Sequence, residues 1–262
     1  MTNGNVQITS AGLTDVGVIR SDNEDNFLMV PDKGLFIVAD GMGGHAAGEV
    51  ASEMAVRIIA RELGALQAAN DQLAKQRMRD AIIQANGAIF ERTLTEQDKK
   101  GMGTTATAMI VVGTQYLIGQ VGDSRAYVMR DGDLRQLTKD HSYVQEQVDA
   151  GYLTPEEART HPYSNVITRC VGANGEVIPD LYSGALHPGD VFLLASDGLT
   201  GMIEDHDLFR ILQSGKAPDP LVAELIAEAN RRGGLDNITA IIVRVDWVGN
   251  KPETNDAETT LA

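Results

Sequence analysis

Short turns join the apolar segments of this chain, and these turns limit its fold more than any other feature. Only Pro31-Asp32-Lys33-Gly34, a strong turn sequence, separates the run FLMV from the run LFIVA. Asp131-Gly132 separates SRAYVMR from DLRQL and predicts a type I′ hairpin turn. Parallel strands need much longer crossover connections than these. The sequence therefore predicts antiparallel sheets.

The remaining segments alternate between strand and helix character along the chain. We expect short strands within 6–39, four strands across 104–137, strands at 176–184 and 190–196, and a last strand at 237–246. We expect helices at 49–66, from Asp71 to about Glu91, from Pro155 onward, around 205–213 and at 218–231. Strands followed by two helices and then more strands are typical of an α+β layered domain, and no internal boundary divides it.

The first two expected helices have apolar residues at helical spacing. In the first, Glu53 and Arg57 stand four residues apart on the opposite, polar face. We expect these side chains to point inward: Val50, Met54, Ile58 and Leu63 from the first helix, and Leu73, Met78, Ile82, Ala85 and Ile89 from the second.

The composition excludes several classes of protein. The chain has 262 residues and a formal charge of −15, which argues against a nucleic-acid partner because phosphates would be repelled. Cys170 is the only cysteine, so neither an intrachain disulfide nor a cysteine-based zinc site can form. The uncharged stretch 104–122 is broken by Gly113-Thr114-Gln115, which favours two strands over a membrane span. We expect a soluble, cytoplasmic protein without a membrane partner.

Acidic residues recur where the apolar strands end or begin. They stand beside glycine or in a tight loop, and they are Asp40, Asp123, Asp197 and Asp236. Turn chemistry alone accounts for any one of them. If these ends lie on one rim of the fold, however, two carboxylates about 4 Å apart repel by roughly 4 kcal/mol, and bound cations relieve that repulsion. Oxygen ligands without a His or Cys cluster indicate Mg²⁺ or Mn²⁺.

The glycine-rich loop after Asp40 permits a second interpretation. Residues 41–46 match G-x-G-x-x-A, the dinucleotide-binding fingerprint, between an expected strand and an expected helix. Asp40 would then place a negative charge beside the pyrophosphate. The segment 64–92 also has no strand to carry the acidic residue that binds the ribose. Both points disfavour a nucleotide site.

Six motifs, in order, resemble the metal-dependent Ser/Thr protein phosphatases of type 2C in their compact bacterial form. They are Arg20-x-x-Asn23-Glu24-Asp25, Asp40-Gly41-Met42-Gly43-Gly44, Gly103-Thr104-Thr105, Gly122-Asp123-Ser124-Arg125, Ser196-Asp197-Gly198 and Asp236-Asn237. The resemblance covers roughly residues 8–246. It implies a four-layer α-β-β-α sandwich with two antiparallel sheets face to face and a catalytic domain over 1–246. The polar composition of the last residues predicts a disordered tail over 247–262.

The resemblance also implies a centre of two Mn²⁺ or Mg²⁺ ions. Asp40 would bridge both ions and the carbonyl of Gly41 would complete one, while Asp197 and Asp236 would hold the other. Asp123, with Asp197, matches the position of a third, weaker ion. Glu24 and Asp25 would act through metal-bound waters. Arg20 would bind the phosphate, since a guanidinium can hold two phosphate oxygens at once.

The implied reaction is hydrolysis of phosphoserine and phosphothreonine in proteins by a water that bridges the two metals. The implied partners are phosphorylated proteins that are substrates of a bacterial Ser/Thr kinase, and the kinase itself. Many eukaryotic members carry a His after the Asp-Gly pair, whereas this chain has Met42. The donor of the leaving-group proton is therefore open, and His45, His141 and His161 are candidates only by their nearness in sequence.

Residues 141–175 correspond in the resemblance to a mobile flap that contacts substrate, although an ordinary polar surface excursion fits the sequence equally well. A catalytically dead phosphoprotein-binding module on the same fold is an alternative from another class. Such a module should lack a metal ligand, and every implied ligand is present here.

Overall fold

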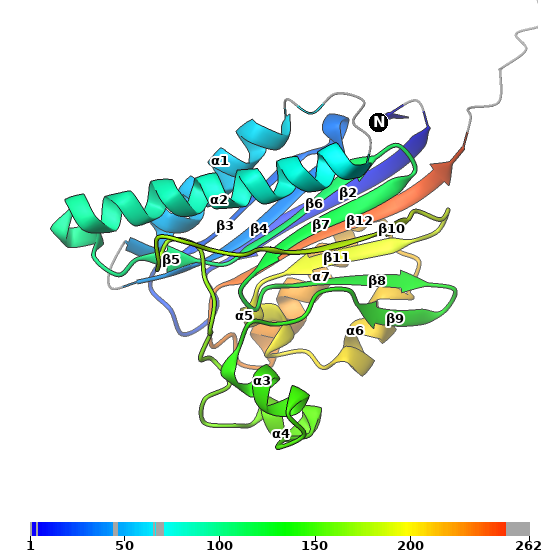
Figure 1. The fold of residues 1–262 in the computed structure, drawn as a ribbon. Helices are drawn as coiled ribbons and strands as arrows, with labels where there is room; N and C mark the ends of the chain where they lie inside the picture. The colour runs from blue at the N-terminus through cyan, green and yellow to red at the C-terminus, as the bar shows by residue number, and fades with distance from the viewer. Residues whose placement is uncertain (1, 4, 44–46, 65, 67–70, 250–262) are drawn as a thin grey trace, which may run out of the picture.

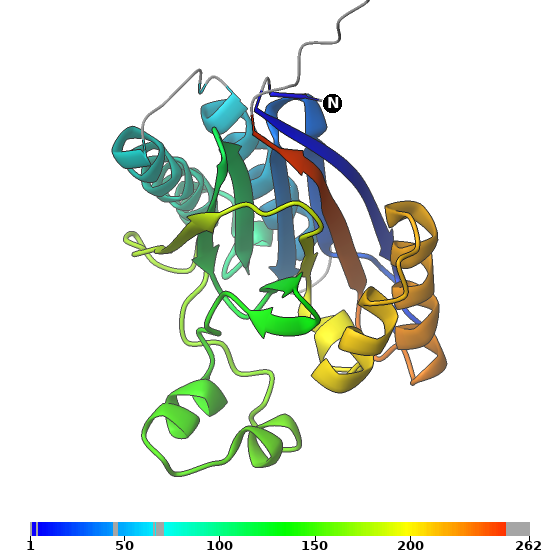
Figure 2. The same ribbon diagram turned by 90° about the vertical axis from the view of Figure 1, so that its right-hand side faces the viewer.

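The computed structural model describes residues 2–3, 5–43, 47–64, 66 and 71–249, and the expected tail lies largely outside this range. Within it, twelve strands form two sheets, and every described pairing between them is antiparallel. The sheets lie face to face with helices outside them, as Figures 1 and 2 show. The predicted four-layer α-β-β-α sandwich is confirmed.

The first sheet has the strand order β1-β2-β12-β11-β8-β9. These strands are β1 (Thr2–Asn3), β2 (Val6–Asp15), β12 (Ile238–Val248), β11 (Val191–Ala195), β8 (Arg125–Arg130) and β9 (Asp133–Gln136). Asp131 and Gly132 both have positive φ angles, of 52° and 77°, so the predicted type I′ turn between β8 and β9 is confirmed.

The second sheet has the order β10-β7-β6-β4-β3, and a short β5 pairs with the end of β4. These strands are β10 (Asp180–Ala185), β7 (Gln115–Val121), β6 (Ala106–Val112), β4 (Leu35–Met42), β3 (Asp25–Val30) and β5 (Gly103–Thr104). A 3₁₀ turn over Pro31–Lys33 joins β3 to β4, which confirms the predicted hairpin.

Two helices cover the outer face of each sheet. α1 (Ala47–Gly64) and α2 (Asp71–Thr95) pack on the second sheet, and α6 (Asp205–Leu212) and α7 (Pro218–Arg231) pack on the first. A one-turn helix, α5 (Asp197–Thr200), follows β11, and a 3₁₀ turn, Gln97–Lys99, follows α2. None of the described helices is long and apolar enough to cross a bilayer.

The central strands are apolar along their whole length because both of their faces are buried. In β4, Leu35, Ile37 and Ala39 pack under α1 and α2, while Phe36 and Val38 pack between the sheets. Since successive side chains point to opposite faces, a strand with two covered faces shows no polar alternation. The sandwich therefore has three apolar layers, two under helices and one between the sheets.

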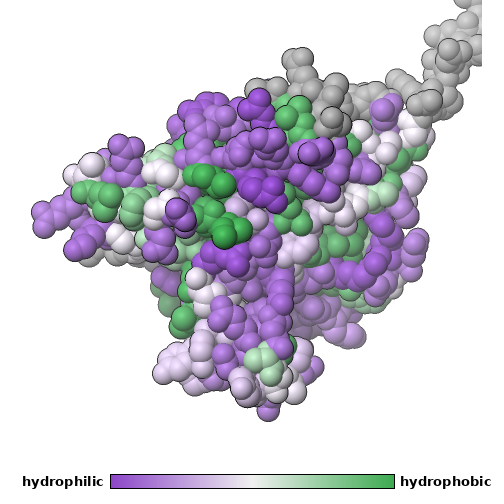
Figure 3. Space-filling model, in the orientation of Figure 1, coloured by the Kyte–Doolittle hydropathy of each residue, from purple (hydrophilic) through white to green (hydrophobic). Residues whose placement is uncertain are grey.

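The polar residues of the chain gather on its outside. The face of the molecule shown in Figure 3 is mostly hydrophilic, and hydrophobic residues interrupt it in small groups. Such groups are ordinary on a folded protein, because there is not enough polar surface to cover it completely.

The predicted inward residues of α1 all pack against the apolar core, but only Leu63 is fully buried. Val50, Met54 and Ile58 are only partly buried, and the fully buried contact line runs through Ala51, Ala55, Val56 and Ile59. Small alanines let the helix axis approach the sheet, so the larger side chains lie at the margins of the contact. The predicted Glu53–Arg57 ion pair is present, with Oε1 and Nη2 2.6 Å apart.

Two further expectations need correction. Leu73 is 43% exposed, because the buried positions of α2 follow the helical period from Ala74 through Met78, Ile82, Ala85 and Ile89. The strand expected at 176–184 begins only at Asp180. Pro179 directly precedes it and has no N–H to donate to the sheet.

The part of 141–175 that carries two short helices projects from one end of the sandwich, visible below the sheets in Figure 1, whereas Val171 returns to the core and pairs with Thr104. The two helices are α3 (Tyr143–Asp149) and α4 (Pro155–Arg159). Thr154 caps α4 with a reciprocal capping box and Pro155 occupies its first turn, as the sequence predicts.

Candidate metal centre

The predicted site residues lie at one end of the sandwich because neighbouring strands deliver them there. Asp25 begins β3 and stands directly opposite Asp40 on β4. In the other sheet, Asp197 follows β11, and Asp236 lies two residues before β12, the antiparallel neighbour of β11. The two sheets are joined at this end by the Ser196 hydroxyl, which donates to Asp25 Oδ2 at 2.7 Å.

Glycine permits the close approach of the segments that carry these carboxylates. A Cβ on Gly198 would lie 2.0 Å from the carbonyl oxygen of Asn237, so only glycine lets the start of α5 meet the start of β12. A Cβ on Gly41 would lie 2.2 Å from the carbonyl oxygen of Gly48. The glycine after Asp40 is thus required by the packing of β4 against α1.

Asp25 is the most enclosed carboxylate of the group, at 5% exposure. Its Oδ2 accepts from Ser196, and its Oδ1 has no hydrogen-bond partner among the described residues. Burial is the main cause that raises the pKa of Asp25 to about 7, and the charges of Asp197 and Asp236 add to it. A buried carboxylate oxygen without a donor is costly, so this oxygen is available to a further donor.

The four other aspartates, Asp40, Asp123, Asp197 and Asp236, retain partial exposure. Burial raises the pKa of Asp40 well above its ordinary value, and the charges of Asp25, Asp197, Asp123 and Asp236 raise it further. The pKa of Asp123 is raised by burial and then by the charge of Asp197. Five carboxylates from five separate motifs of the chain therefore share one electrostatic environment.

A buried polar network connects the loop of Asp123 to Asp40. The hydroxyl of Thr105 accepts from the backbone N–H of Asp40 at 2.9 Å and shares a 2.7 Å hydrogen bond with the hydroxyl of Ser124. Thr104 donates its hydroxyl to the carbonyl of Asp40 at 2.8 Å. The motifs of the sequence include these residues but assign no role to their hydroxyls. In the folded chain they fix the backbone of Asp40.

Arg20 lies at the rim of the site, on the loop between β2 and β3. Its Nη2 is 2.7 Å from Asp236 Oδ2, and its side chain is 51% exposed. Asn237 holds this loop in place, because its amide donates to the carbonyls of Val16 and Asp22 at 2.9 Å each. The guanidinium is thus positioned beside the carboxylates yet remains open to solvent.

Glu24 binds the start of α1 and lies beside the same cluster. Its Oε1 accepts from the N–H of Gly48 at 3.2 Å, and its own N–H donates to Asn237 Oδ1 at 2.8 Å. Burial is the largest cause that raises the pKa of Glu24, and the charge of Asp236 contributes. Glu24 is therefore close enough to the aspartates to feel their charge.

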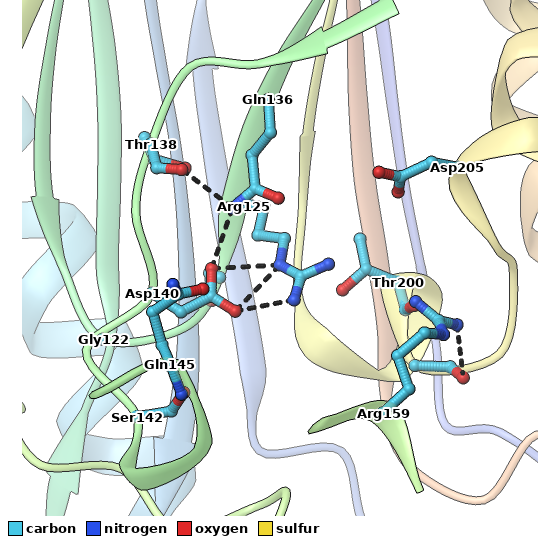
Figure 4. Close-up of polar contacts among 12 residues, drawn as sticks. Gly122, Arg125, Gln136, Thr138, Asp140, Ser142, Gln145, Arg159, Thr200 and Asp205 are labelled. Carbon is cyan, nitrogen blue, oxygen red and sulfur yellow. Dashed lines mark hydrogen bonds and ion pairs between the residues drawn. The ribbon is translucent and has the colours of Figure 1, made fainter. Parts of the chain in front are cut away.

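The start of β8, directly after the loop of Asp123, is fixed to the residue before the segment 141–175 by charged contacts (Figure 4). Arg125 makes a bidentate ion pair with Asp140, with its Nη2 2.7 Å from Oδ2 and its Nε 3.0 Å from Oδ1. Farther out, Arg159 of α4 donates to the carbonyl of Thr200 at 3.2 Å. The segment 141–175 thus contacts the β7–β8 loop through His141 and Gly122, and the helix that begins at Asp197 through Arg159.

The two histidine candidates that the structure describes, His141 and His161, do not face the aspartate cluster as proton donors. His141 is buried, and its Nδ1 accepts from the N–H of Gly122 at 3.0 Å while its Nε2 lies 3.1 Å from Asp180 Oδ2. His161 packs against Tyr143 and Tyr163 on the flap. His45 lies outside the described residues.

The donor set suits hard divalent cations, because the converging side chains offer only oxygen. The raised pKa values of Asp25, Asp40, Asp123 and Asp197 and the unpartnered Asp25 Oδ1 both indicate a centre that cations would stabilise. Among the described residues, no three Asp, Glu, His or Cys side chains yet form a group that could hold a metal ion. The carboxylate of Asp236 is paired with Arg20 instead, with Oδ2 2.7 Å from Nη2.

Comparison with known proteins supports this interpretation. The profile of the family described as "Protein phosphatase 2C" matches residues 20–232. The chain is 41% identical over 239 residues to the serine/threonine phosphatase stp of Listeria monocytogenes, covering 89% of this chain and 94% of that protein.

Two solved structures are similar throughout the sandwich. The Mycobacterium tuberculosis serine/threonine phosphatase PstP/Ppp has a TM-score of 0.85 at 38% identity, covering 91% of this chain and 99% of that chain. The catalytic domain of PstP, solved in complex with two manganese ions, has a TM-score of 0.82 at 38% identity, covering 91% and 98%.

Proposed function

The chain belongs to the protein phosphatase 2C family, and from this premise we propose that it hydrolyses phosphoserine and phosphothreonine in proteins with the help of two Mn²⁺ or Mg²⁺ ions. The observation that carries the proposal is the group of five aspartates beside one exposed arginine. When bound, divalent cations act as Lewis acids that activate water and offset the charge that develops on the phosphoryl group.

The residues of this chain have distinct parts in holding the ions. Asp40 and the carbonyl of Gly41, with Asp197 and Asp236, would hold the two core ions, and Asp123 with Asp197 would hold a third. The strongest support is the set of charges that raise the pKa of Asp40, which come from each of these aspartates. Glu24 and Asp25 would act through bound water. Asp25 Oδ1 is a buried acceptor available for that purpose.

Arg20 would bind and orient the phosphate of the substrate. Its guanidinium is exposed and lies at the edge of the aspartate cluster, where Asp236 pairs with it. A phosphate that enters the site would compete for this guanidinium. Two parallel N–H donors can hold two phosphate oxygens and fix the phosphorus for attack. The exchange would also free Asp236 to bind a cation.

We further propose that the segment 141–175 acts as a substrate-contacting flap on the catalytic domain that spans 1–246. Its support is the contact of Arg159 with the carbonyls of Thr200 and Gly201, next to the helix that carries Asp197. A phosphoprotein that reaches the aspartates from this side would touch the flap as well.

Turnover of p-nitrophenyl phosphate and of a phosphothreonine peptide tests the function. Hydrolysis of both is expected with Mn²⁺ and is expected to cease with EDTA. Folded protein that binds the phosphopeptide without hydrolysing it would indicate a binding module instead.

We propose that the physiological substrates are phosphorylated by a Ser/Thr kinase, that the kinase is itself a substrate, and that the enzyme acts in the cytoplasm, where such kinases use ATP. Loss of phosphate from a purified autophosphorylated Ser/Thr kinase is the expected result. A kinase that stays phosphorylated while the peptide is hydrolysed would refute this part.

A further inference from the structure

Three large apolar side chains are exposed on two turns beside Arg20. Val18 is 62% exposed, Ile19 is 64% exposed and Leu235 is 57% exposed. Single exposed apolar residues are ordinary, but several on touching segments form a patch of the kind that marks binding surfaces. We refer to Val18, Ile19 and Leu235 as the rim patch.

Backbone hydrogen bonds hold the two turns side by side. The N–H groups of Val18 and Ile19 both donate to the carbonyl of Gly234, at 2.8 and 3.2 Å. The φ angles of Gly17 and Gly234, +81° and +51°, fix the conformation of the turns. The turns therefore need glycine for their shape, and nothing in that shape requires apolar side chains at the three neighbouring positions.

The rim patch adjoins the proposed phosphate-binding residues along both turns of the chain. Ile19 directly precedes Arg20, and Leu235 directly precedes Asp236. The ion pair between Arg20 and Asp236 therefore joins the same two turns that carry the rim patch. Each residue of an extended peptide spans at most about 3.6 Å. A residue one or two positions from a phosphorylated residue held at Arg20 therefore lies within about 7 Å of it.

We propose that the rim patch binds an apolar side chain next to the phosphorylated residue of the substrate protein. This inference rests on the proposed function and deepens it, because it names the sequence context that the enzyme prefers. The phosphate would bind Arg20 by charge, while the neighbouring apolar side chain would lose its hydration against Ile19 and Leu235. Peptides with a polar residue at the same position would lack the second contact.

Paired phosphothreonine peptides test the proposal. In the first series, each peptide carries a single leucine one or two positions before or after the phosphothreonine. In the matched series, serine replaces that leucine. We expect the wild-type protein to favour one leucine peptide by about tenfold in kcat/KM, the range typical of a small change in apolar contact. Ile19→Ser, Leu235→Ser and the double variant should reduce this ratio toward one. Leu94→Ser, at an equally exposed position at the end of α2, should retain it.

Turnover of p-nitrophenyl phosphate, which has no flanking residues, normalises each variant for the integrity of its catalytic centre. Wild-type protein that hydrolyses this compound but shows no preference among the peptides overturns the rim-patch proposal alone. A preference that survives in the double variant overturns it too. Absence of all turnover refutes the proposed function and the inference together. Self-association that the double variant abolishes, with an unchanged peptide ratio, would assign the patch to a second copy of the chain.

Discussion

Asp25 and Asp40 lie directly opposite each other on β3 and β4, so two carboxylates face the same end of the sandwich across one antiparallel pair. Like charges in this position destabilise a sheet. Burial is the largest cause that raises the pKa of Asp40, and the charge of Asp25 is the next largest. The fold keeps this unfavourable pair where the charges of three further aspartates also raise the pKa of Asp40.

The pH dependence of stability should report the buried Asp25. Its pKa is raised from 3.8 to about 7, so the folded protein holds this proton more tightly than the unfolded chain does. The resulting stabilisation is complete below about pH 3.8 and is lost as the pH rises through about 7. Three pKa units correspond to about 4 kcal/mol. In EDTA, Asp25→Asn should therefore gain stability relative to wild type between pH 4 and pH 8, measured by urea unfolding. Parallel profiles for the two proteins would contradict the assignment.

Removal of the Asp40 charge should separate activity from stability. We expect Asp40→Asn to lose turnover of p-nitrophenyl phosphate to the detection limit and, in EDTA, to unfold at a higher temperature than wild type because repulsion is relieved. Mn²⁺ at about 100 times its Kd should stabilise the wild type by about 2.7 kcal/mol and should not stabilise the variant. Asp32→Asn, in the exposed turn between β3 and β4, is the matched control. Wild-type rates in Asp40→Asn would remove Asp40 from the site.

Substitution of Arg20 should affect catalysis much more than folding. Arg20→Lys keeps the charge but loses the planar pair of donors, and we expect kcat/KM for a phosphopeptide to fall about 100-fold. The ion pair with Asp236 is exposed, so the free energy of unfolding should change by less than about 1 kcal/mol. Arg57→Lys, in the exposed pair with Glu53 on α1, should leave kcat/KM unchanged. Equal rates for the two variants would refute the role of Arg20.

The Arg125–Asp140 pair should stabilise the protein more than a surface pair does. The Asp140 side chain is 8% exposed and the Arg125 side chain 22%, so Asp140→Ala would leave a largely buried guanidinium without its partner. We expect a loss of about 3 kcal/mol in urea unfolding. Asp133→Ala, which breaks the exposed pair of Asp133 with Arg135, should cost less than about 1 kcal/mol. Similar losses in both variants would show that the burial of the pair is unimportant.

Two glycines should respond in opposite directions to the same substitution. In Gly198→Ala the new methyl group would collide with the carbonyl of Asn237, and we expect a loss of about 2 kcal/mol with weaker Mn²⁺ binding. Gly87 lies in α2, where a new methyl group would have no atom within 4 Å, and Gly87→Ala should stabilise the protein by about 1 kcal/mol. Thermal unfolding with and without Mn²⁺ measures both effects. A neutral Gly198→Ala would show that α5 can move away from β12.

Local sequence was enough to predict the antiparallel sheets and most of the elements. Turn residues such as Pro31–Gly34 and Asp131-Gly132 act locally, so their sequence predicts hairpins without further information. The apolar periods of α2 and α7 likewise predict helices without reference to the rest of the chain. The motifs predicted the family and the oxygen-rich set of site residues.

How these pieces meet became clear only from the folded chain. Whether Val50 or Ala51 faces the sheet depends on how closely α1 can approach it, which no helical period specifies. The exposed pairing of Arg20 with Asp236, the anchoring of Asp40 by Thr105, and the unpartnered oxygen of Asp25 each depend on residues far apart in the chain. Such contacts arise from the stacking of two sheets, and the packing of the whole sandwich sets their geometry.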